Sequence, residues 1–283
     1  MQKNIQQLDA HHSSCQCELG FSAIEMLVAV ALLMVVLGVV VQGMIDVQRR
    51  NTSETSKVDA VQDTRNFIDQ MVRDIHGVGY PPPAAILTGQ PYCNDPTTGA
   101  VTAMRMNPNV ACGVVLYSPT QVVYEGDLGD GTGVSVVFLN LVAGNGNQCP
   151  CTLQRGVVRK VDWVANPANF PVPGVQYFTT VNGVLNSGNG ANPPASTYGV
   201  KLSGTGNYTS FSRADVFDAY NANAQQVTVT CNLGTNATAG VNASTCSQIR
   251  SLQITANVVP AFADPTIKQF QVYSITSKAR INF

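Results

Sequence analysis

The chain has 283 residues, of which 45 % are hydrophobic and only 12 % are charged, and its formal net charge is −1. Cytosolic proteins carry about 25 % charged residues, so this composition indicates a loop-rich β protein outside the cytosol. A nearly neutral chain without a long basic block offers little electrostatic attraction to a nucleic acid. The sequence therefore predicts no cofactor and indicates no clear nucleic-acid or small-molecule ligand.

The first predicted element is an apolar segment near the N-terminus. Residues 26–41 are apolar without interruption, and the segment 21–45 is long enough to cross a bilayer, which takes about 20 residues in a helix. An ordinary secretory signal has a small-residue cleavage site after its apolar stretch, whereas here Gly20 precedes the stretch and no such site follows it. The segment is therefore predicted to remain in the mature protein as a membrane-spanning helix.

The same helix is predicted to continue far beyond the apolar segment, because no proline occurs between residues 21 and 80. Gly77, Gly79 and the prolines at 81–83 end it. We expect a transmembrane half over 21–45 and an amphipathic half over 46–76, in which apolar residues recur every three to four positions. The predicted stripe of this second half consists of Val58, Val61, Arg65, Phe67, Ile68, Met71, Val72 and Ile75.

A single carboxylate, Glu25, directly precedes the uninterrupted apolar run, at its N-terminal end. A charge placed inside hydrocarbon costs about 2.5 to 3.5 kcal/mol or more, so such a residue usually has a partner. One interpretation is that Glu25 extends to the membrane interface and needs no partner. The other is that the chain is cleaved after Gly20, so that Glu25 of one subunit pairs with the α-amino group of Phe21 in a neighbouring subunit.

Residues 20–29, Gly-Phe-Ser-Ala-Ile-Glu-Met-Leu-Val-Ala, resemble the cleavage and methylation motif of type IV prepilins and type II secretion pseudopilins. The layout of the whole chain is similar to that of the larger minor pilins and the J-type pseudopilin. The resemblance implies that residues 1–20 are a leader peptide, which prepilin peptidase removes after Gly20. It also implies that Phe21 is N-methylated and that Glu25 is the acid required for ordered subunit addition.

The resemblance further implies where the protein acts. A prepilin is a single-pass protein of the bacterial inner membrane with its head outside the cytoplasm, and it then joins a pilus or pseudopilus in the periplasm or at the cell surface. Its partners would be other pilin or pseudopilin subunits, prepilin peptidase and the inner membrane. The choice between pilus and pseudopilus, and between a tip and a shaft position, stays open.

Residues 77–283 are predicted to form a β-rich extracytoplasmic head. The clearest signal is a hairpin, with strands at 121–125 and 134–139 on either side of turn-forming residues. The fold class is therefore α+β and pilin-like, with the long N-terminal helix packed on a C-terminal antiparallel sheet. Further strands are expected at 152–164, 226–230, 249–258, 270–275 and 279–283, and loops at 81–120, 181–215 and 231–246.

Six of the eight cysteines follow the apolar segment, and they are Cys93, Cys112, Cys149, Cys151, Cys231 and Cys246. An even set in a polar region beyond a membrane segment favours disulfides in an oxidising compartment. A metal site is the competing interpretation, but its spacing is poor and no histidine is near. Pairing Cys93 with Cys112 and Cys231 with Cys246 gives the shortest loops but leaves a cramped Cys149–Cys151 bridge, so the pairing stays open.

Few residues suit catalysis, because His11, His12 and His76 are the only histidines and the first two would leave with the leader. One histidine builds neither a typical catalytic triad nor a His-rich zinc site. The chain is therefore predicted not to be an enzyme. The alternative to an assembly subunit is a membrane-tethered extracytoplasmic adhesin or binding protein that does not polymerise and that binds through exposed loops.

Glu125, Asp127 and Asp130 form a weak calcium candidate around Gly131. Their spacing differs from the twelve-residue calcium loop. Aspartate and glycine are also common in tight turns, which explains them without a metal. The sequence therefore leaves a metal site as the less favoured interpretation.

Overall fold

The computed structural model describes residues 22–82, 93, 103–142, 149–165, 175, 177–186, 207–208, 215–235 and 238–281. The chain divides into two compact units, Met1–Arg49 and Arg50–Phe283. The predicted leader, with Gly20, and the predicted mature N-terminus, Phe21, lie outside the described residues. Large parts of the loops predicted at 81–120 and 181–215 lie outside them as well.

The predicted long helix is present as α1, Ala23–His76, a single helix of 54 residues. The backbone carbonyl of Ser22 accepts the first helical hydrogen bonds, from the N–H groups of Glu25 (3.0 Å) and Met26 (3.2 Å). Within the first unit every described side chain is exposed, and α1 contains an 18-residue apolar stretch of which none is buried. By length and composition, this part of α1 is able to span a membrane.

In the second unit, one face of α1 is buried because its apolar residues recur at helical spacing. The residues that the sequence correctly assigns to this face are Phe67, Ile68, Met71 and Ile75, which belong to the core of the head. The predicted stripe is wrong nearer the middle of the helix, where Val58 is 59 % exposed. Ser53 and Lys57 are buried there instead, because residues 261–264 present polar partners to them.

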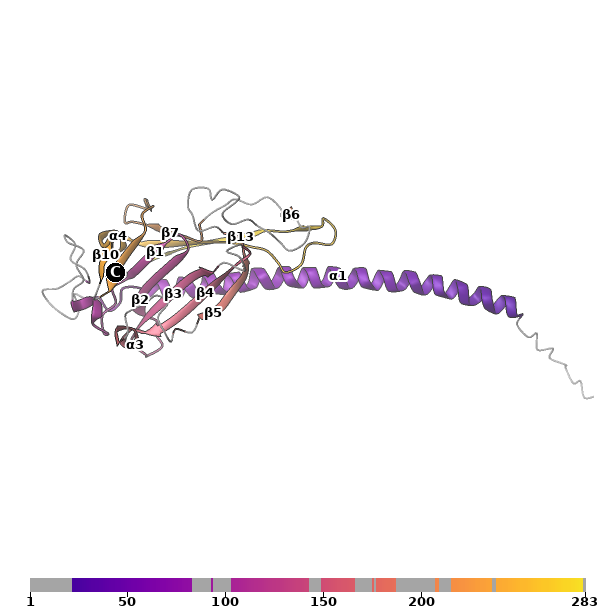
Figure 1. Cartoon of the computed structure of the whole chain (residues 1–283), viewed down its shortest axis with the longest axis horizontal. Helices are drawn as coiled ribbons and strands as arrows, with labels where there is room; N and C mark the ends of the chain where they lie inside the picture. Colours follow the sequence, from indigo (N-terminus) through magenta and orange to yellow (C-terminus); the bar gives the residue numbers. More distant parts are fainter. Residues whose placement is uncertain are drawn as a thin grey trace, which may run out of the picture. The chain divides into compact units, whose positions relative to one another are not determined.

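Eleven strands among the described residues form one sheet, in which β1 to β5 lie side by side (Figure 1). They are β1 (Val114–Ser118), β2 (Gln121–Asp127), β3 (Val134–Val142), β4 (Cys151–Arg159), β5 (Tyr177–Val184), β7 (Phe217–Tyr220), β8 (Gln226–Val227), β9 (Cys231–Thr235), β10 (Thr238–Val241), β11 (Ser251–Val258) and β13 (Tyr273–Arg280). The strand order is β10-β9-β1-β2-β3-β4-β5-β11-β7-β8, and β13 also pairs with β11. Neighbouring strands run antiparallel.

The remaining elements are short. A parallel pair joins β6 (Asn207–Tyr208) to β12 (Gln269–Phe270). The short helices are η1 (Ala103–Met106), α3 (Lys160–Ala165) and α4 (Ala243–Gln248). With one long N-terminal helix and a large antiparallel sheet, the chain is an α+β protein, as the sequence predicts.

The predicted strands are confirmed only in part. The hairpin is correct, because β2 and β3 pair along their length. The strand predicted over 152–164 ends at Arg159, and α3 begins at Lys160, whose side chain reaches the buried carboxylate of Glu125. Trp163 on the same helix is buried against Arg105. The regions predicted as loops contain β1, β9 and β10, which pair with one another and, for β1, with β2. The Val and Tyr residues of β1 are a strand signal that the prediction missed. Strand β13 overlaps both of the strands predicted at 270–275 and 279–283 and joins them into one strand.

Strand β11 is the point where the sheet changes neighbours. On one edge it pairs with β13 along its whole length, and on the other with β7 at residues 251–254 and with β5 at Val258. Between these two pairings, the side-chain amide of Asn186 bonds to the backbone of β11. It donates to the carbonyl of Thr255 (2.8 Å) and accepts the N–H of Asn257 (2.7 Å). A buried side-chain amide thus supplies the hydrogen bonds that a strand would otherwise make.

Candidate functional site

Glu25 occupies the first turn of α1. Its side chain is exposed, and no residue in the described ranges forms an ion pair or hydrogen bond with its carboxylate. A negative charge at this end of a helix interacts favourably with the helix dipole, but this interaction contributes only about 0.3 to 1 kcal/mol. A larger compensation for burial in hydrocarbon would have to come from a group outside the described chain.

In the second unit, α1 is joined to the sheet by a buried ion pair near its C-terminal end. Asp74 is 4 % exposed, and its Oδ2 accepts hydrogen bonds from Arg155 on β4 (2.8 and 2.9 Å) and from the hydroxyl of Tyr124 on β2 (3.3 Å). Burial, together with the charge of Asp74, raises the pKa of Tyr124 well above its ordinary value, so the hydroxyl stays a donor. These contacts fix the orientation of this part of α1 on the sheet.

A second contact fastens residues 261–264 to the helix. Ser56 Oγ accepts the N–H of Ala261 (2.9 Å), and Lys57 Nζ donates to Asp264 (2.9 Å) and to Glu54 (2.7 Å). The hydrogen bonds to Glu54 and Asp264 raise the pKa of Lys57. The hydrogen bond from Lys57 lowers the pKa of Asp264 to about 2.

Asp264→Asn is expected to lower the melting temperature at neutral pH but not at a pH of about 2. The folded-state pKa of Asp264 is below its ordinary value of 3.8. Its carboxylate therefore stabilises the fold fully above that ordinary value, and the contribution is lost as the pH falls through about 2. Because the pair is near the surface, the expected difference is about 1 to 3 °C.

Circular dichroism melts of native and variant protein across this pH range provide the measurement. Asp59→Asn is the matched control, since Asp59 is exposed and has no ion-pair partner among the described residues. A destabilisation by Asp264→Asn that is equally large at low pH would show that its charge is not the cause.

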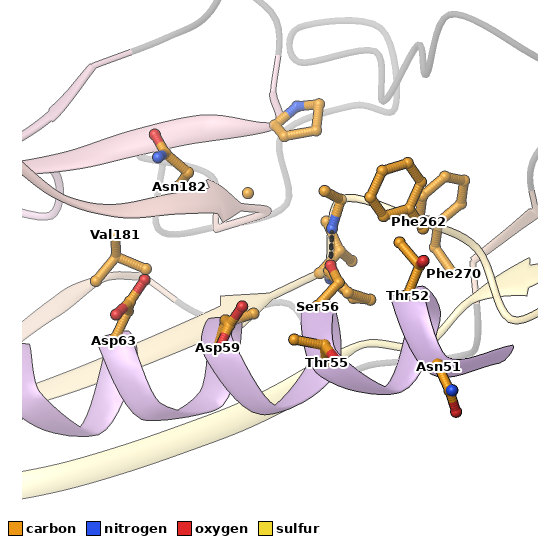
Figure 2. Close-up of a pocket in the computed structure, with 16 residues that line it drawn as sticks. Asn51, Thr52, Thr55, Ser56, Asp59, Asp63, Val181, Asn182, Phe262 and Phe270 are labelled. Carbon is orange, nitrogen blue, oxygen red and sulfur yellow. Dashed lines mark hydrogen bonds between the residues drawn. The ribbon is translucent and has the colours of Figure 1, made fainter. Parts of the chain in front are cut away.

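A groove of about 810 Å³ lies beside this contact, between α1 and the loops of the head (Figure 2). Figure 2 shows Asp59 and Asp63 on successive turns of the helix along one wall. The other side includes Val181, Phe270 and Phe262, of which Phe262 is 54 % exposed. The groove therefore combines two carboxylates with exposed aromatic surface, which would suit a partner that is both basic and apolar.

The head also buries a cluster of three charges, which we call the ionic cluster: Arg105 on η1, Glu125 on β2 and Lys160 on α3. Each of the three side chains is fully buried. Glu125 accepts hydrogen bonds from Arg105 and from Lys160 (2.7 Å), and also from the backbone N–H of Cys112 (3.0 Å). Burial alone would raise the pKa of Glu125, but the charges of Arg105 and Lys160 hold it below its ordinary value.

The ionic cluster holds one more positive than negative charge, and an aromatic ring compensates for part of it. The guanidinium carbon of Arg105 lies 4.4 Å from the ring centroid of Trp163, a cation–π contact. Arg105 Nε and Nη2 have no hydrogen-bond partner among the described residues. Lys160 also donates to the carbonyl of Val110 (2.7 Å). The cluster thus ties η1, β2 and α3 together.

The structure does not bring the three residues of the calcium candidate together as ligands. The carboxylate of Glu125 is buried in the ionic cluster, whereas Asp127 and Asp130 each accept a backbone N–H from the residue two positions later (2.8 and 2.9 Å). In the part of the chain that the structure describes, no group of three His, Cys, Asp or Glu residues is arranged to hold a metal. The turn interpretation therefore accounts for these aspartates.

The six cysteines after the apolar segment form three disulfides. They are Cys93–Cys112, Cys149–Cys151 and Cys231–Cys246, with Cα separations of 5.7, 4.3 and 5.5 Å. The pairing that the sequence left open is therefore the one with the shortest loops, including the cramped bridge. Cys112 also adjoins the ionic cluster, because Lys160 Nζ lies 3.6 Å from its sulfur.

Sequence patterns missed the residues that carry most of this geometry. Arg105 and Lys160 each stand beside apolar residues, in Ala-Met-Arg-Met and in Val-Val-Arg-Lys-Val. A charge within an apolar stretch is a usable signal for a buried ion pair, but it does not identify the partner. Asp74 had no such signal, because it falls within an ordinary helical pattern.

No known protein family, curated protein or solved structure matches this chain. Its function therefore has to be inferred from its own residues and their geometry.

Proposed function

We propose that the chain is a structural and assembly subunit, a minor pilin or pseudopilin, of a type IV pilus or type II secretion pseudopilus. The observation that carries this proposal is α1. Its first part is apolar on every side and exposed over its whole described length, and it has one carboxylate, Glu25, in its first turn. A helix of this kind requires lipid or other apolar helices around it.

The chemistry of the segment before α1 supports assembly rather than simple anchoring. Cleavage after Gly20 would create an α-amino group at Phe21, four residues before Glu25 in the sequence. In a bundle of such helices, the amine of one subunit would neutralise the carboxylate of another. The exposed apolar surface would then pass from lipid contact in the inner membrane to helix contact in the filament.

The head supports a location outside the cytoplasm. Three disulfides are typical of an oxidising compartment. The head also has a large sheet and a groove along α1. A subunit that only packs into the filament would need neither. We assign it no catalytic role and place it among the less abundant subunits of the assembly.

The direct test is mass spectrometry of the mature protein from cells with active prepilin peptidase. The expected N-terminal peptide begins at Phe21 and carries one methyl group on its amine. The matched sample comes from cells without the peptidase, where the peptide should begin upstream of Gly20. A chain that keeps its leader in cells with active peptidase would contradict the proposal.

The groove beside α1 favours one alternative, a membrane-tethered adhesin or binding protein that does not polymerise. The two candidates differ in where the protein is found. A filament subunit sediments in part with sheared filaments, whereas a tethered binding protein stays wholly in the inner-membrane fraction.

A further inference from the structure

The groove beside α1 has an acidic end and an aromatic end. Asp59 and Asp63 line one part of it, and Phe262 and Phe270 line another, where Figure 2 shows their rings over the part of α1 that carries Thr52. Positions 52, 59 and 63 are separated by seven and four residues, so they lie on the same face of the helix. The groove therefore runs along this face, with its carboxylates nearer the C-terminal end of α1 and its aromatic rings nearer the N-terminal end.

The two carboxylates at the acidic end are open to a ligand. Both side chains are exposed, and neither forms an ion pair or hydrogen bond with a described residue. Lys57, the nearest cation before them on α1, is already bonded to Glu54 and Asp264. Two like charges one helical turn apart destabilise each other, so cations that bind beside both of them are favoured.

Hydrogen bonds hold both sides of the groove in place, so a ligand does not have to order them. On one side, Ser56 Oγ accepts the N–H of Ala261 (2.9 Å), which is the dashed line in Figure 2. On the other, the N–H of Val259 donates to the carbonyl of Gly183 (3.0 Å). A Cβ on Gly183 would lie 2.5 Å from the carbonyl oxygen of Val259, so glycine permits this close approach. A site that is already ordered loses less entropy when it binds.

The spacing of these groups suits an extended peptide that lies along the helix. Asp59 and Asp63 are about 6 Å apart along the helix axis, and alternate side chains of an extended chain are about 6.6 Å apart on the same side. Thr52, at the aromatic end, is about 10 Å from Asp59 along the axis, which is about the length of three extended residues. A side chain three positions beyond a basic residue points to the opposite side of an extended chain, away from α1 and toward the aromatic rings.

We propose that this groove binds an extended segment of another protein that has two basic residues at alternate positions and an apolar residue three positions beyond them. The basic residues pair with Asp59 and Asp63, and the apolar side chain covers Phe262. The groove volume of about 810 Å³ is within the range of ligand sites, about 300 to 1,000 Å³. The inference does not depend on filament assembly, because a filament subunit and a tethered binding protein could both use such a site.

The test is equilibrium dialysis of the full chain, in an uncharged maltoside detergent, against two labelled peptides. The lysine peptide is acetyl-Leu-Ser-Ser-Lys-Ser-Lys-Ser-Ser-Leu-amide, whose order of side chains is the same in both directions. The glutamate peptide has glutamate in place of both lysines. The native chain is expected to bind the lysine peptide saturably, with a dissociation constant on the order of 0.1 to 1 mM, and the glutamate peptide at least about tenfold more weakly.

Reversing the charge of the groove should reverse its preference. The double variant Asp59→Lys/Asp63→Lys is expected to bind the lysine peptide at least about tenfold more weakly than the native chain does, and the glutamate peptide more tightly than the lysine peptide. Phe262→Ala should weaken binding of the lysine peptide by about fivefold, since less apolar surface is covered. Asp69→Lys is the matched control, because Asp69 is an exposed acid on the same helix outside the groove.

Circular dichroism verifies that each variant is folded, and Asp59→Asn/Asp63→Asn replaces the double reversal if that variant is not. Equal binding of the two peptides by the native chain would show that the groove binds only apolar groups, such as lipid or detergent chains, and would overturn the proposal. An equal loss in Asp69→Lys would attribute the effect to net charge and overturn it as well. So would the absence of saturable lysine-peptide binding at concentrations up to about 10 mM.

Discussion

Glu125→Gln is expected to lower the free energy of unfolding of the head by about 3 to 5 kcal/mol. The change keeps the shape of the side chain but leaves Arg105 and Lys160, both fully buried, without a counter-charge. Removing one partner of a buried ion pair destabilises the fold far more than replacing the whole pair with apolar residues does. The reason is that the remaining charge stays desolvated and unpaired. Since total stability is only about 5 to 15 kcal/mol, this one substitution removes a large share of it.

Urea titration followed by the fluorescence of Trp163 measures this effect. Trp163 is the only tryptophan in the chain and contacts Arg105, so its emission reports on the ionic cluster itself. Asp162→Asn is the matched control, because Asp162 pairs with Arg159 on the surface with both side chains more than half exposed. That change is expected to cost less than about 1 kcal/mol.

A triple variant separates the charge effect from the loss of packing. Arg105→Met, Glu125→Leu and Lys160→Met together remove all three charges and keep most of the volume. This variant is expected to be more stable than Glu125→Gln alone, because no desolvated charge is left. If Glu125→Gln costs less than about 1 kcal/mol, water reaches the cluster and the argument from burial is wrong.

The helix and the hairpin could be predicted from the sequence because their signals are local. An apolar run, helical spacing and the absence of proline are properties of neighbouring residues, and they predicted α1 to its last residue, His76. The hairpin of β2 and β3 is similar, since its turn residues stand between the strands they join. The three disulfides also join residues that are close in the sequence, but spacing alone left their pairing open, because the shortest-loop set requires the cramped Cys149–Cys151 bridge.

The parts that could not be predicted depend on partners far away in the chain. Glu125 is 20 residues from Arg105 and 35 from Lys160, and nothing near Lys160 indicated that a strand would end there and α3 begin. Ser53 is buried against the carbonyl of Ala263, 210 residues later, so helical periodicity alone placed Val58 on the wrong face.

Glu25→Gln is expected to leave cleavage after Gly20 intact but to reduce incorporation into filaments by about a hundredfold. Glutamine removes the charge and keeps the size of the side chain, so insertion of the helix into lipid is not impaired. In the proposed filament, the damage would appear on assembly, when the amine of a neighbouring Phe21 would be buried without a counter-charge. The penalty for such a charge in hydrocarbon is about 2.5 to 3.5 kcal/mol, which corresponds to about a hundredfold in an equilibrium constant.

Immunoblots of the sheared-filament and inner-membrane fractions measure this partition, and mass spectrometry of the membrane fraction verifies that the variant starts at Phe21. Asp46→Asn is the matched control, because Asp46 is an exposed acid at the other end of the same unit and outside the apolar run. It should be incorporated at the native level. Glu25→Asp should retain part of the incorporation, since the charge remains and only its reach is shortened.

The result distinguishes the two explanations for a lone acid beside an apolar run. If Glu25 only extends to the membrane interface, neutralising it removes a small free-energy penalty for a charge beside hydrocarbon. The variant then enters filaments as well as the native chain does. If it pairs with an amine, neutralising it transfers the full desolvation penalty to that amine, and the variant accumulates in the membrane in its cleaved form. Cleaved Glu25→Gln at native levels in filaments would therefore remove the reason for placing a carboxylate in the first turn of α1.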